Sequence, residues 1–402
     1  MHPFIGVGRT LRARGHDVTV VTSEPFRTVS ERAGLRFVTT HPAIQFDELL
    51  NHPDLWHSRR GLFLILRSVV EGMRVEYARI AEVYEPGRSI LVGHFLAFAT
   101  RVFEEVHGGP AATLQLAPSA FRSDYGQPAF APGRDASGWP RWLKRTLWWA
   151  VDRLMVDPRV VPELNRWRSE FGLPPMSRIF KAWVHSPRRV IGLFPPWFGP
   201  PQRDWPAQAR LTGFPLYDES DQQVIDPELH TFLDEGDPPL AFTAGTANRA
   251  AAAFFAAAAD ATKRLGRRAL LLTRFPEQVP TTLPSSIRYC AYAPFSRVLP
   301  RCAAIVHHGG IGTCAQGLAA GIPQLTMPLG FDQPDNVTRL WKLGVGRWVA
   351  PHRFTGPRVA TALGGLLDDA RVSDASRRWA AEVRGVDALG ATCDLLEQLA
   401  PA

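Results

Sequence analysis

The stretch from Tyr292 to Asn336 combines residue types that can hold an anion. An apolar run predicts a buried strand over residues 303–306, and a glycine-rich turn, His307-His308-Gly309-Gly310-Ile311-Gly312, leads into a helix expected from Thr313. The first amide N–H groups of a helix lack intrahelical partners and carry partial positive charge, and a histidine or threonine side chain can donate a further hydrogen bond. The spacing therefore predicts a phosphate or pyrophosphate site. An ordinary tight turn with two surface histidines is the alternative.

Two common phosphate-binding and metal-binding motifs do not occur in the sequence, and the absence of each argues against one class of site. No GxxxxGK[ST] string occurs, which argues against an ATPase or kinase built on that type of phosphate-binding loop. No Asp-x-Asp string that could hold a divalent cation occurs either, so we expect a helix N-terminus and a histidine, rather than a metal ion, to stabilise the charge of a bound phosphate group. The sequence thus predicts no metal site and activity without added metal.

The elements around this turn alternate between strand and helix, which predicts α/β units with parallel sheets. The expected strands cover residues 18–22, 89–92, 111–116, 190–194, 240–243, 269–273, 303–306 and 324–327, and the expected helices cover residues 7–14, 250–265 and 313–320. Residues 195–215 are rich in proline and cannot form a long helix or a central strand. We therefore expect two domains, residues 1–205 and 206–402.

The beginning of the first domain is unusual. A doubly wound sheet opens with a strand and a tight loop before its first helix. Here the sequence enters the helix at once, so the first strand of the N-terminal domain is expected to be missing from the sequence as given.

Composition excludes several classes of protein. The chain has 402 residues, of which 45% are hydrophobic, and this excludes a disordered chain. No apolar run reaches the ~20 residues that a membrane-spanning helix needs, and no signal peptide is recognisable, so we expect a cytoplasmic protein with four reduced cysteines. The net charge of +8 comes without a zinc-finger, helix-turn-helix or RNA-binding motif, so we expect an arginine-rich surface and no nucleic-acid partner.

The segment from Tyr292 resembles the donor-nucleotide box of the family 1 glycosyltransferases, which have the GT-B fold of two Rossmann-like doubly wound domains with a cleft between them. The resemblance implies that the N-terminal domain binds the acceptor and the C-terminal domain binds a nucleotide sugar. It also implies a set of donor-binding residues: Gly245 and Thr246 at the phosphates, Tyr292 and Ala293 at the base, His307 or His308 with Gly309, Gly310, Gly312 and Thr313 at the pyrophosphate, and Asp332 and Gln333 at the sugar hydroxyls. Where the family often has an acidic residue for the ribose, this chain has Ala315 or Gln316, depending on which histidine is matched.

Strings outside that box resemble, within the family, the rhamnosyltransferases of rhamnolipid synthesis. They are Pro53–Trp56, Arg178–Pro187, Phe194–Pro206 and Thr212–Leu216. This resemblance implies an inverting enzyme that moves a hexose, L-rhamnose from dTDP-rhamnose, to a hydroxyl of a lipid-like acceptor. The nucleotide sugar is then a co-substrate, and no cofactor is expected. The corresponding turn of the rhamnolipid enzymes favours His307 over His308 as the phosphate ligand.

Three rival functions stay open on the sequence alone. A UDP-glucose-dependent transferase acting on sterols or other natural products would share the fold. A nucleotide-sugar epimerase would isomerise the donor without an acceptor. A donor-binding subunit would have lost its catalytic base.

The catalytic base must deprotonate the acceptor hydroxyl. The resemblance puts this base two residues before the position that matches His2, which is upstream of Met1, so activity of the sequence as given depends on a substitute. His2 and His94, which follows an expected strand, are the two candidates.

The segment Trp139 to Trp149 mixes four tryptophans with Arg141, Lys144 and Arg145. A helix of this composition can lie at a membrane surface, form the wall of an apolar acceptor pocket, or pack in a core. Trp148 and Trp149 are the residues expected to contact an acceptor or lipid. Lipid contact would place the protein peripherally at the inner membrane.

Overall fold

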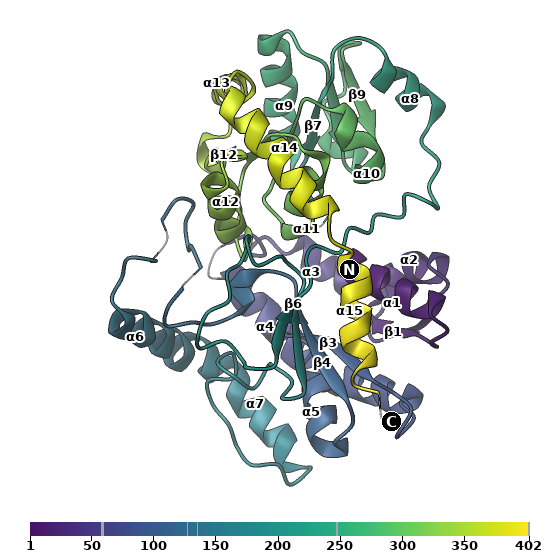
Figure 1. The fold of residues 1–402 in the computed structure, drawn as a ribbon, viewed down its shortest axis with the longest axis vertical. Coiled ribbons are helices and arrows are strands. Elements are labelled where there is room, and N and C mark those ends of the chain that lie inside the picture. Colours follow the sequence, from purple (N-terminus) through teal and green to yellow (C-terminus); the bar gives the residue numbers. More distant parts are fainter. Residues whose placement is uncertain (58–59, 127, 135, 247, 401–402) are drawn as a thin grey trace. The chain divides into compact units, whose positions relative to one another are not determined.

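A computed structural model describes residues 1–57, 60–126, 128–134, 136–246 and 248–400, which form two compact units (Figure 1). Unit 1 consists of Met1–Pro128, Ala136–Pro215 and Asp387–Ala402, and unit 2 consists of Ala129–Asp135 and Leu216–Val386. The division after Pro215 lies further along the chain than the expected boundary at residue 205. The reason is a short strand in the proline-rich segment, which pairs at the edge of the sheet of unit 1.

The elements have the following bounds. The strands are β1 (Thr19–Thr22), β2 (Arg36–Thr39), β3 (Leu91–His94), β4 (Ala111–Gln115), β5 (Arg189–Gly192), β6 (Ala209–Leu211), β7 (Leu240–Thr243), β8 (Ala269–Leu272), β9 (Ile287–Cys290), β10 (Ala304–His307), β11 (Gln324–Thr326) and β12 (Gly346–Trp348). The helices are α1 (His2–Ala13), α2 (Arg27–Arg32), α3 (Ala43–Asn51), α4 (Arg60–Val83), α5 (Phe98–His107), α6 (Arg141–Val151), the π-helical η3 (Asp152–Val156), α7 (Asp157–Ser169), α8 (Pro227–Asp234), α9 (Ala252–Leu265), α10 (Phe295–Val298), α11 (Ile311–Ala320), α12 (Gln333–Lys342), α13 (Gly356–Leu367), α14 (Ala370–Arg384) and α15 (Ala388–Glu397). Of the helices that the structure describes, none has both the length and the apolar character that crossing a membrane requires.

Unit 2 contains one parallel sheet of six strands in the order β12-β11-β10-β7-β8-β9. Sequence order runs outward from β7 in one direction and from β10 in the other, which is the doubly wound arrangement of a Rossmann-like domain. The expected strands at β7, β8, β10 and β11 are confirmed to within one residue at each end, and β9 and β12 complete the sheet.

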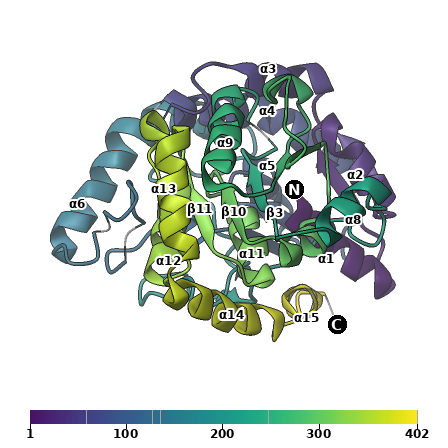
Figure 2. The ribbon, with the colours of Figure 1, turned by 90° about the horizontal axis from the view of Figure 1, so that it is seen from above.

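The strands of unit 2 send alternate side chains to two apolar faces. Leu240 and Phe242 of β7 pack with α9 and α13, which lie side by side in Figure 2. Ala241, between them, packs on the opposite face with Leu229 and Leu233 of α8. Because both faces are covered, these strands read in the sequence as continuous apolar runs.

The parallel strands of unit 1 form two sheets, a four-stranded one in the order β3-β4-β5-β6 and the pair β1-β2. Within the described residues, no strand pairs with both β1 and β3. The strand expected at residues 18–22 is present as β1, and its residues are half-buried. α1 begins at His2, earlier than expected, with Pro3 in its first turn, where the fixed φ of proline suits a helix start.

The C-terminal helix α15 packs in unit 1 beside α1 (Figure 1). Cys393 and Leu396 of α15 share an apolar cluster with Val7 of α1 and with side chains of β4 and β5. At the rim, Arg14 donates hydrogen bonds of 2.7 Å to both Asp394 and Glu397. The packing of α15 therefore returns the end of the chain to the unit in which it begins.

Replacing Leu396 tests this packing. Leu396 is 1% exposed, so Leu396→Ala is expected to lower the free energy of unfolding of unit 1 by about 2–5 kcal/mol through lost burial and a cavity. Urea unfolding followed by tryptophan fluorescence measures the change, since most tryptophans lie in unit 1. Glu397→Gln, which removes the negative charge that pairs with Arg14 and His16 at the surface, is the control and should change stability little. Equal effects of the two variants would contradict the packing role.

Candidate functional site

The expected pyrophosphate turn lies where the strand order of unit 2 reverses, at the carboxyl ends of β7 and β10. Gly245 and Thr246 follow β7, and His308 and Gly309 follow β10. In open α/β sheets, ligands bind at the carboxyl edge at such a reversal. The fold therefore brings together two groups of predicted residues that are far apart in the sequence.

His307 is a structural residue at the end of β10. It is fully buried, and both ring nitrogens are used: Nε2 lies 3.0 Å from Oε1 of Gln324, and Nδ1 accepts a hydrogen bond from the N–H of Gly309 at 3.1 Å. Burial lowers the pKa of His307 to about 3, so the ring is neutral near pH 7. The preference for His307 as the phosphate ligand does not fit a ring whose two nitrogens already have protein partners.

His308 lies between the two loops at the strand reversal. A Cβ on Gly245 would come within 2.7 Å of Cε1 of its ring, and a Cβ on Gly310 would also clash with the ring. The Nδ1 atom of His308 is shielded from solvent and has no hydrogen-bond partner among the described residues. Burial lowers the pKa of His308 to about 4, so the neutral ring presents one donor and one acceptor. The geometry thus favours His308 as the histidine that meets a phosphate.

The N-terminus of α11 follows directly. Gly310 is its N-cap and, as a glycine, has no side chain to cap the helix, while the carboxylate of Asp332 accepts a hydrogen bond from the N–H of Ile311. Gly309 has φ +87°, a conformation that only glycine adopts readily. Gly312 is exposed, and a Cβ placed on it would meet no atom within 4 Å. The first turn of α11, with Thr313, therefore offers backbone N–H groups and open space to an anion.

Asp332 and Asn336 connect α12 to this turn. The Nδ2 atom of Asn336, which is fully buried, donates to the carbonyl oxygen of Gly309 at 3.1 Å and to Oδ2 of Asp332 at 2.7 Å. Burial raises the pKa of Asp332, while hydrogen bonds from Asn336 and from the backbone N–H of Ile311 oppose the rise. Asp332 therefore lies at the start of α11. Asn336 was not predicted, although its place one helical turn after Asp332 is a signal that could have found it.

Three other predicted residues have buried side chains. Ala293 packs in the core of one sheet face, and Gln316 is buried in α11, so neither side chain is in position to contact a ligand directly. Gln333 accepts hydrogen bonds from the N–H groups of Leu329 at 2.7 Å and Gly330 at 3.3 Å, which shapes the loop before α12. No group of three His, Cys, Asp or Glu side chains in the described ranges is placed to hold a metal ion.

Tyr292 follows β9 at the same edge of the sheet. Its Oη atom donates to the carbonyl oxygen of Asp218 at 2.8 Å, and the guanidinium of Arg274 lies 5.5 Å from its ring centre. Burial raises the pKa of Tyr292, which keeps the hydroxyl protonated and donating. Arg274, which follows β8, was not predicted, because nothing in its sequence context distinguishes it from the many other arginines.

The two candidate bases lie in unit 1. The Nδ1 atom of His94 accepts a 3.4 Å hydrogen bond from the N–H of Leu96, and the rings of Phe4 and Phe95 pack against it. Burial lowers the pKa of His94 to about 4, and the nearby N-terminal amino group adds to the shift. A base with this pKa is weak in the free protein. His2 is half-buried in the first turn of α1. Their catalytic roles stay predictions.

The two neighbouring tryptophans of α6 have different environments. Trp148 is buried, its Nε1 atom donates to the carbonyl oxygen of Ser123 at 3.3 Å, and the guanidinium of Arg122 lies 4.2 Å from its ring centre. Trp149 is 49% exposed. The burial of Trp148 argues against contact of its side chain with a lipid surface, and the expected acceptor contact stays a prediction.

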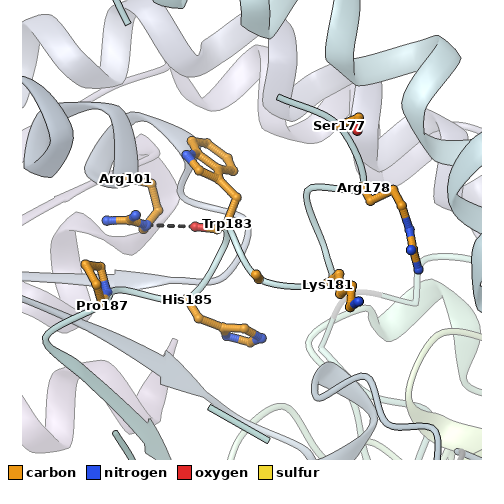
Figure 3. A pocket seen from close by; sticks show the side chains of 8 residues that line it. Arg101, Ser177, Arg178, Lys181, Trp183, His185 and Pro187 are labelled. Atoms are coloured by element: carbon orange, nitrogen blue, oxygen red, sulfur yellow. Dashed lines mark hydrogen bonds between the residues drawn. The ribbon is translucent and has the colours of Figure 1, made fainter. Parts of the chain in front are cut away.

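Unit 1 also contains a cavity of about 490 Å³ between α5 and the segment Ser177–Pro187 (Figure 3). Arg101, Arg178 and Lys181 line it beside Trp183, and none of the described acidic side chains does so. Its volume is in the range of small-molecule sites. The cavity is suited to a ligand that has both a polar or anionic group and an apolar part.

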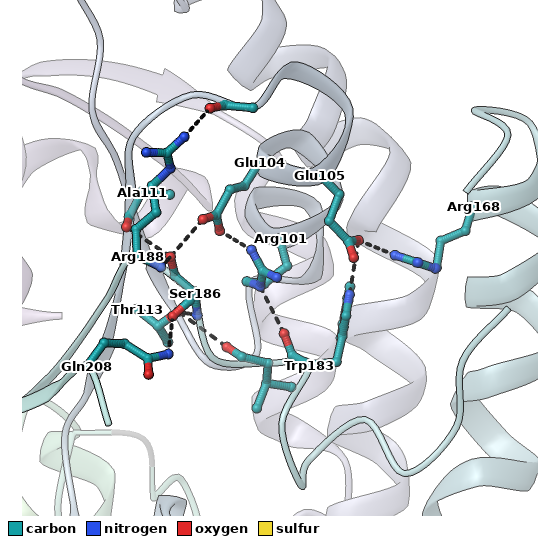
Figure 4. A network of polar contacts seen from close by, with 12 residues as sticks. Arg101, Glu104, Glu105, Ala111, Thr113, Arg168, Trp183, Ser186, Arg188 and Gln208 are labelled. Atoms are coloured by element: carbon teal, nitrogen blue, oxygen red, sulfur yellow. Dashed lines mark hydrogen bonds and ion pairs between the residues drawn. The ribbon is translucent and has the colours of Figure 1, made fainter. Parts of the chain in front are cut away.

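A buried polar network fixes the wall of this cavity to α5 (Figure 4). The Nε atom of Arg101 donates to the carbonyl oxygen of Trp183 at 2.8 Å, and its guanidinium forms an ion pair with Glu104. Glu104 in turn accepts a 2.7 Å hydrogen bond from the hydroxyl of Ser186. Because unpaired buried charges are costly, this network holds residues 183–186 in place.

The two adjacent histidines make a matched test. His308→Ala is expected to weaken binding of thymidine diphosphate by roughly ten- to a hundredfold, because a hydrogen bond to a charged group contributes about 1.5–3 kcal/mol, while the fold is kept. Isothermal titration calorimetry measures the affinity. His307→Ala should instead lower the unfolding temperature by breaking the Gln324 contact. Wild-type affinity in His308→Ala would contradict the assignment.

Two glycines of the turn separate folding from binding. Gly312→Ala should retain the stability of the wild type, since the added Cβ has free space and alanine favours a helix by up to about 1 kcal/mol relative to glycine. The same variant should weaken diphosphate binding, because the Cβ would obstruct the approach to the amide groups. Gly309→Ala should destabilise unit 2 by about 1–2 kcal/mol because of its positive φ. Thermal unfolding and calorimetric titration give both quantities. Undiminished binding by Gly312→Ala would argue against direct contact at the helix start.

Comparison with known proteins gives a family match, a relative similar over its full length and two similar solved structures. Residues 272–386 match the family described as Erythromycin biosynthesis protein CIII-like, C-terminal domain. The chain is 30% identical over 414 residues to O-mycaminosyltylonolide 6-deoxyallosyltransferase of Streptomyces fradiae, with all of this chain and 94% of that protein covered. The solved glycosyltransferase of kitacinnamycin matches with a TM-score of 0.75 at 21% identity, covering 100% of this chain and 96% of that one.

A second solved structure, the spinosyn rhamnosyltransferase SpnG complexed with thymidine diphosphate, matches with a TM-score of 0.68 at 19% identity, covering 98% of this chain and 96% of that one. These neighbours show the GT-B fold, and the full-length relative shows the family. The chain is an enzyme that belongs to the family 1 glycosyltransferases.

Proposed function

We propose that this glycosyltransferase moves L-rhamnose from dTDP-rhamnose, with inversion at the anomeric carbon, to a hydroxyl of a lipid-like acceptor. The observation that carries the donor part is the first turn of α11, where amide groups, open space at Gly312 and an unpartnered Nδ1 atom of His308 meet. This combination suits the diphosphate of a nucleotide sugar. The strings that resemble the rhamnolipid enzymes support rhamnose as the sugar.

Two relatives support a thymidine-linked deoxyhexose. The name of the full-length relative describes transfer of a 6-deoxyallosyl group, and rhamnose is also a 6-deoxyhexose. The SpnG structure is that of a rhamnosyltransferase solved with thymidine diphosphate. The relative supports the choice of donor through similarity of sequence, and the SpnG structure supports it through similarity of fold. The proposal that a diphosphate binds rests on the site residues of this chain.

In the proposed mechanism, unit 2 stabilises the leaving group. Negative charge builds on the diphosphate as the anomeric bond breaks, and donors already oriented toward it lower the barrier. The amide groups of Gly312 and Thr313 and the neutral ring of His308 are those donors. Asp332, at the start of α11, would accept hydrogen bonds from sugar hydroxyls, and Asn336 would hold it there.

Unit 1 is the proposed acceptor domain, and its cavity beside Trp183 is the proposed acceptor site. A lipid-like acceptor with a polar head would place that head among Arg178 and Lys181 and an apolar part against Trp183. His2 and His94 are the proposed candidates for the catalytic base.

One rival acceptor is favoured by a specific observation. The full-length relative is named for transfer to O-mycaminosyltylonolide, a glycosylated natural product rather than a lipid. A ring-based natural product would use the same donor chemistry. The acceptor must therefore be tested separately from the donor.

A donor and acceptor screen tests the proposal. The full chain is incubated with dTDP-rhamnose or UDP-glucose and with either a 3-hydroxyalkanoyl lipid or O-mycaminosyltylonolide, and products are measured by mass spectrometry. Rhamnosylated lipid from dTDP-rhamnose is the expected product. Glucosylated product from UDP-glucose would overturn the donor, and rhamnosylation of the natural product alone would overturn the acceptor.

Two controls complete the screen. A reaction with donor alone detects epimerised nucleotide sugar, which would instead favour an epimerase. Parallel reactions with EDTA are expected to keep full activity, and a loss reversed by magnesium would contradict stabilisation by the helix and histidine. Binding of thymidine diphosphate, measured by calorimetry, does not need the catalytic base. An inactive protein that binds thymidine diphosphate therefore lacks a working base, whereas an inactive protein that does not bind it contradicts the proposed donor site.

A further inference from the structure

Three tryptophans in or next to α6 have side chains that are about half exposed or more. Trp142 is 67% exposed, Trp149 is 49% exposed, and Trp139, just before the helix, is 48% exposed. Leu154 in η3, the continuation of α6, is 67% exposed. Large apolar side chains that gather on one exposed surface usually mark an interaction site.

The same surface is positively charged. Arg141, Arg145 and Arg153 are exposed between these apolar side chains, and the one acidic residue from 136 to 156, Asp152, is completely buried. Asp124, from a preceding segment, pairs with Arg145 at 3.0 Å. We call the surface formed by Trp139, Arg141, Trp142, Arg145, Trp149, Arg153 and Leu154 the α6 face.

The opposite side of α6 holds the helix in place. Lys144 is buried, and its Nζ atom donates to the carbonyl oxygens of Tyr125 at 2.7 Å and Ser137 at 3.0 Å. Trp148 is buried one turn later, and Asp152 after it forms an ion pair with Arg122 at 2.5 Å. Because this buried stripe fixes the rotation of the helix, the α6 face is exposed in the folded protein.

We propose that the α6 face binds the surface of an anionic phospholipid bilayer. Tryptophan rings prefer the boundary between lipid headgroups and acyl chains, and arginines beside them can pair with lipid phosphates. Charge complementarity selects this partner, since the face has three exposed arginines and no exposed carboxylate of its own. The proposal goes beyond transfer of a sugar and does not depend on which donor is used.

Vesicle co-sedimentation tests the proposal with the full chain. The wild type should bind vesicles that contain phosphatidylglycerol, bind vesicles of phosphatidylcholine alone far less, and lose binding as salt concentration rises. Trp142→Ser combined with Trp149→Ser should reduce binding to the anionic vesicles by about tenfold or more. Arg145→Gln combined with Arg153→Gln should weaken it as well.

A matched control is Trp341→Ser, which removes a tryptophan of α12 that is 48% exposed and lies in unit 2. This variant should bind anionic vesicles like the wild type, and circular dichroism should show all variants folded. Absence of binding by the wild type, or equal binding by the double tryptophan variant, would overturn the proposal. A wild-type dimer in analytical ultracentrifugation that becomes monomeric in the double variant, without vesicle binding, would show instead that two copies of the protein meet at this face.

Discussion

The amide groups of Gly312 and Thr313 at the start of α11 are the feature on which the proposed chemistry depends. A helix N-terminus binds an anion through N–H groups that have no other partner, and here Asp332 already accepts a hydrogen bond from the N–H of Ile311. Here Gly309 turns the chain with a positive φ, and Asn336 holds the carbonyl oxygen of that residue, so the turn keeps its shape. Burial keeps the ring of His308 neutral, so it adds a hydrogen-bond donor without a fixed charge.

The rest of unit 2 serves to position this turn. The doubly wound order puts β7 and β10 side by side, so Gly245 meets the ring of His308 although the two residues are distant in the sequence. Replacing Gly245 or Gly310 by any other residue would place a Cβ against the ring of His308. The sheet, its two apolar faces and the small residues at its carboxyl edge are therefore parts of one arrangement.

Much of this could be predicted from the sequence, because buried parallel strands read as continuous apolar runs and the glycine turn is local. Which of the two histidines keeps an unpartnered ring nitrogen could not be predicted, since it depends on the hydrogen bond between Gln324 and the ring of His307. The hydrogen bond from Asn336 to Gly309 cannot be predicted from the neighbouring sequence, because it depends on how α12 packs against the turn. The burial of Trp148 beside the exposed Trp149 likewise depends on tertiary contacts. α1 begins at His2 rather than at residue 7, because Pro3 fits the first turn of the helix.

The most direct test of the central claim is backbone hydrogen exchange with and without thymidine diphosphate, at a concentration that calorimetry shows to be saturating. The account predicts that exchange slows at Gly312 and Thr313, since their amide groups would donate to the diphosphate, with little change on the far edge of the sheet. Unchanged exchange at both residues in the saturated protein would contradict it.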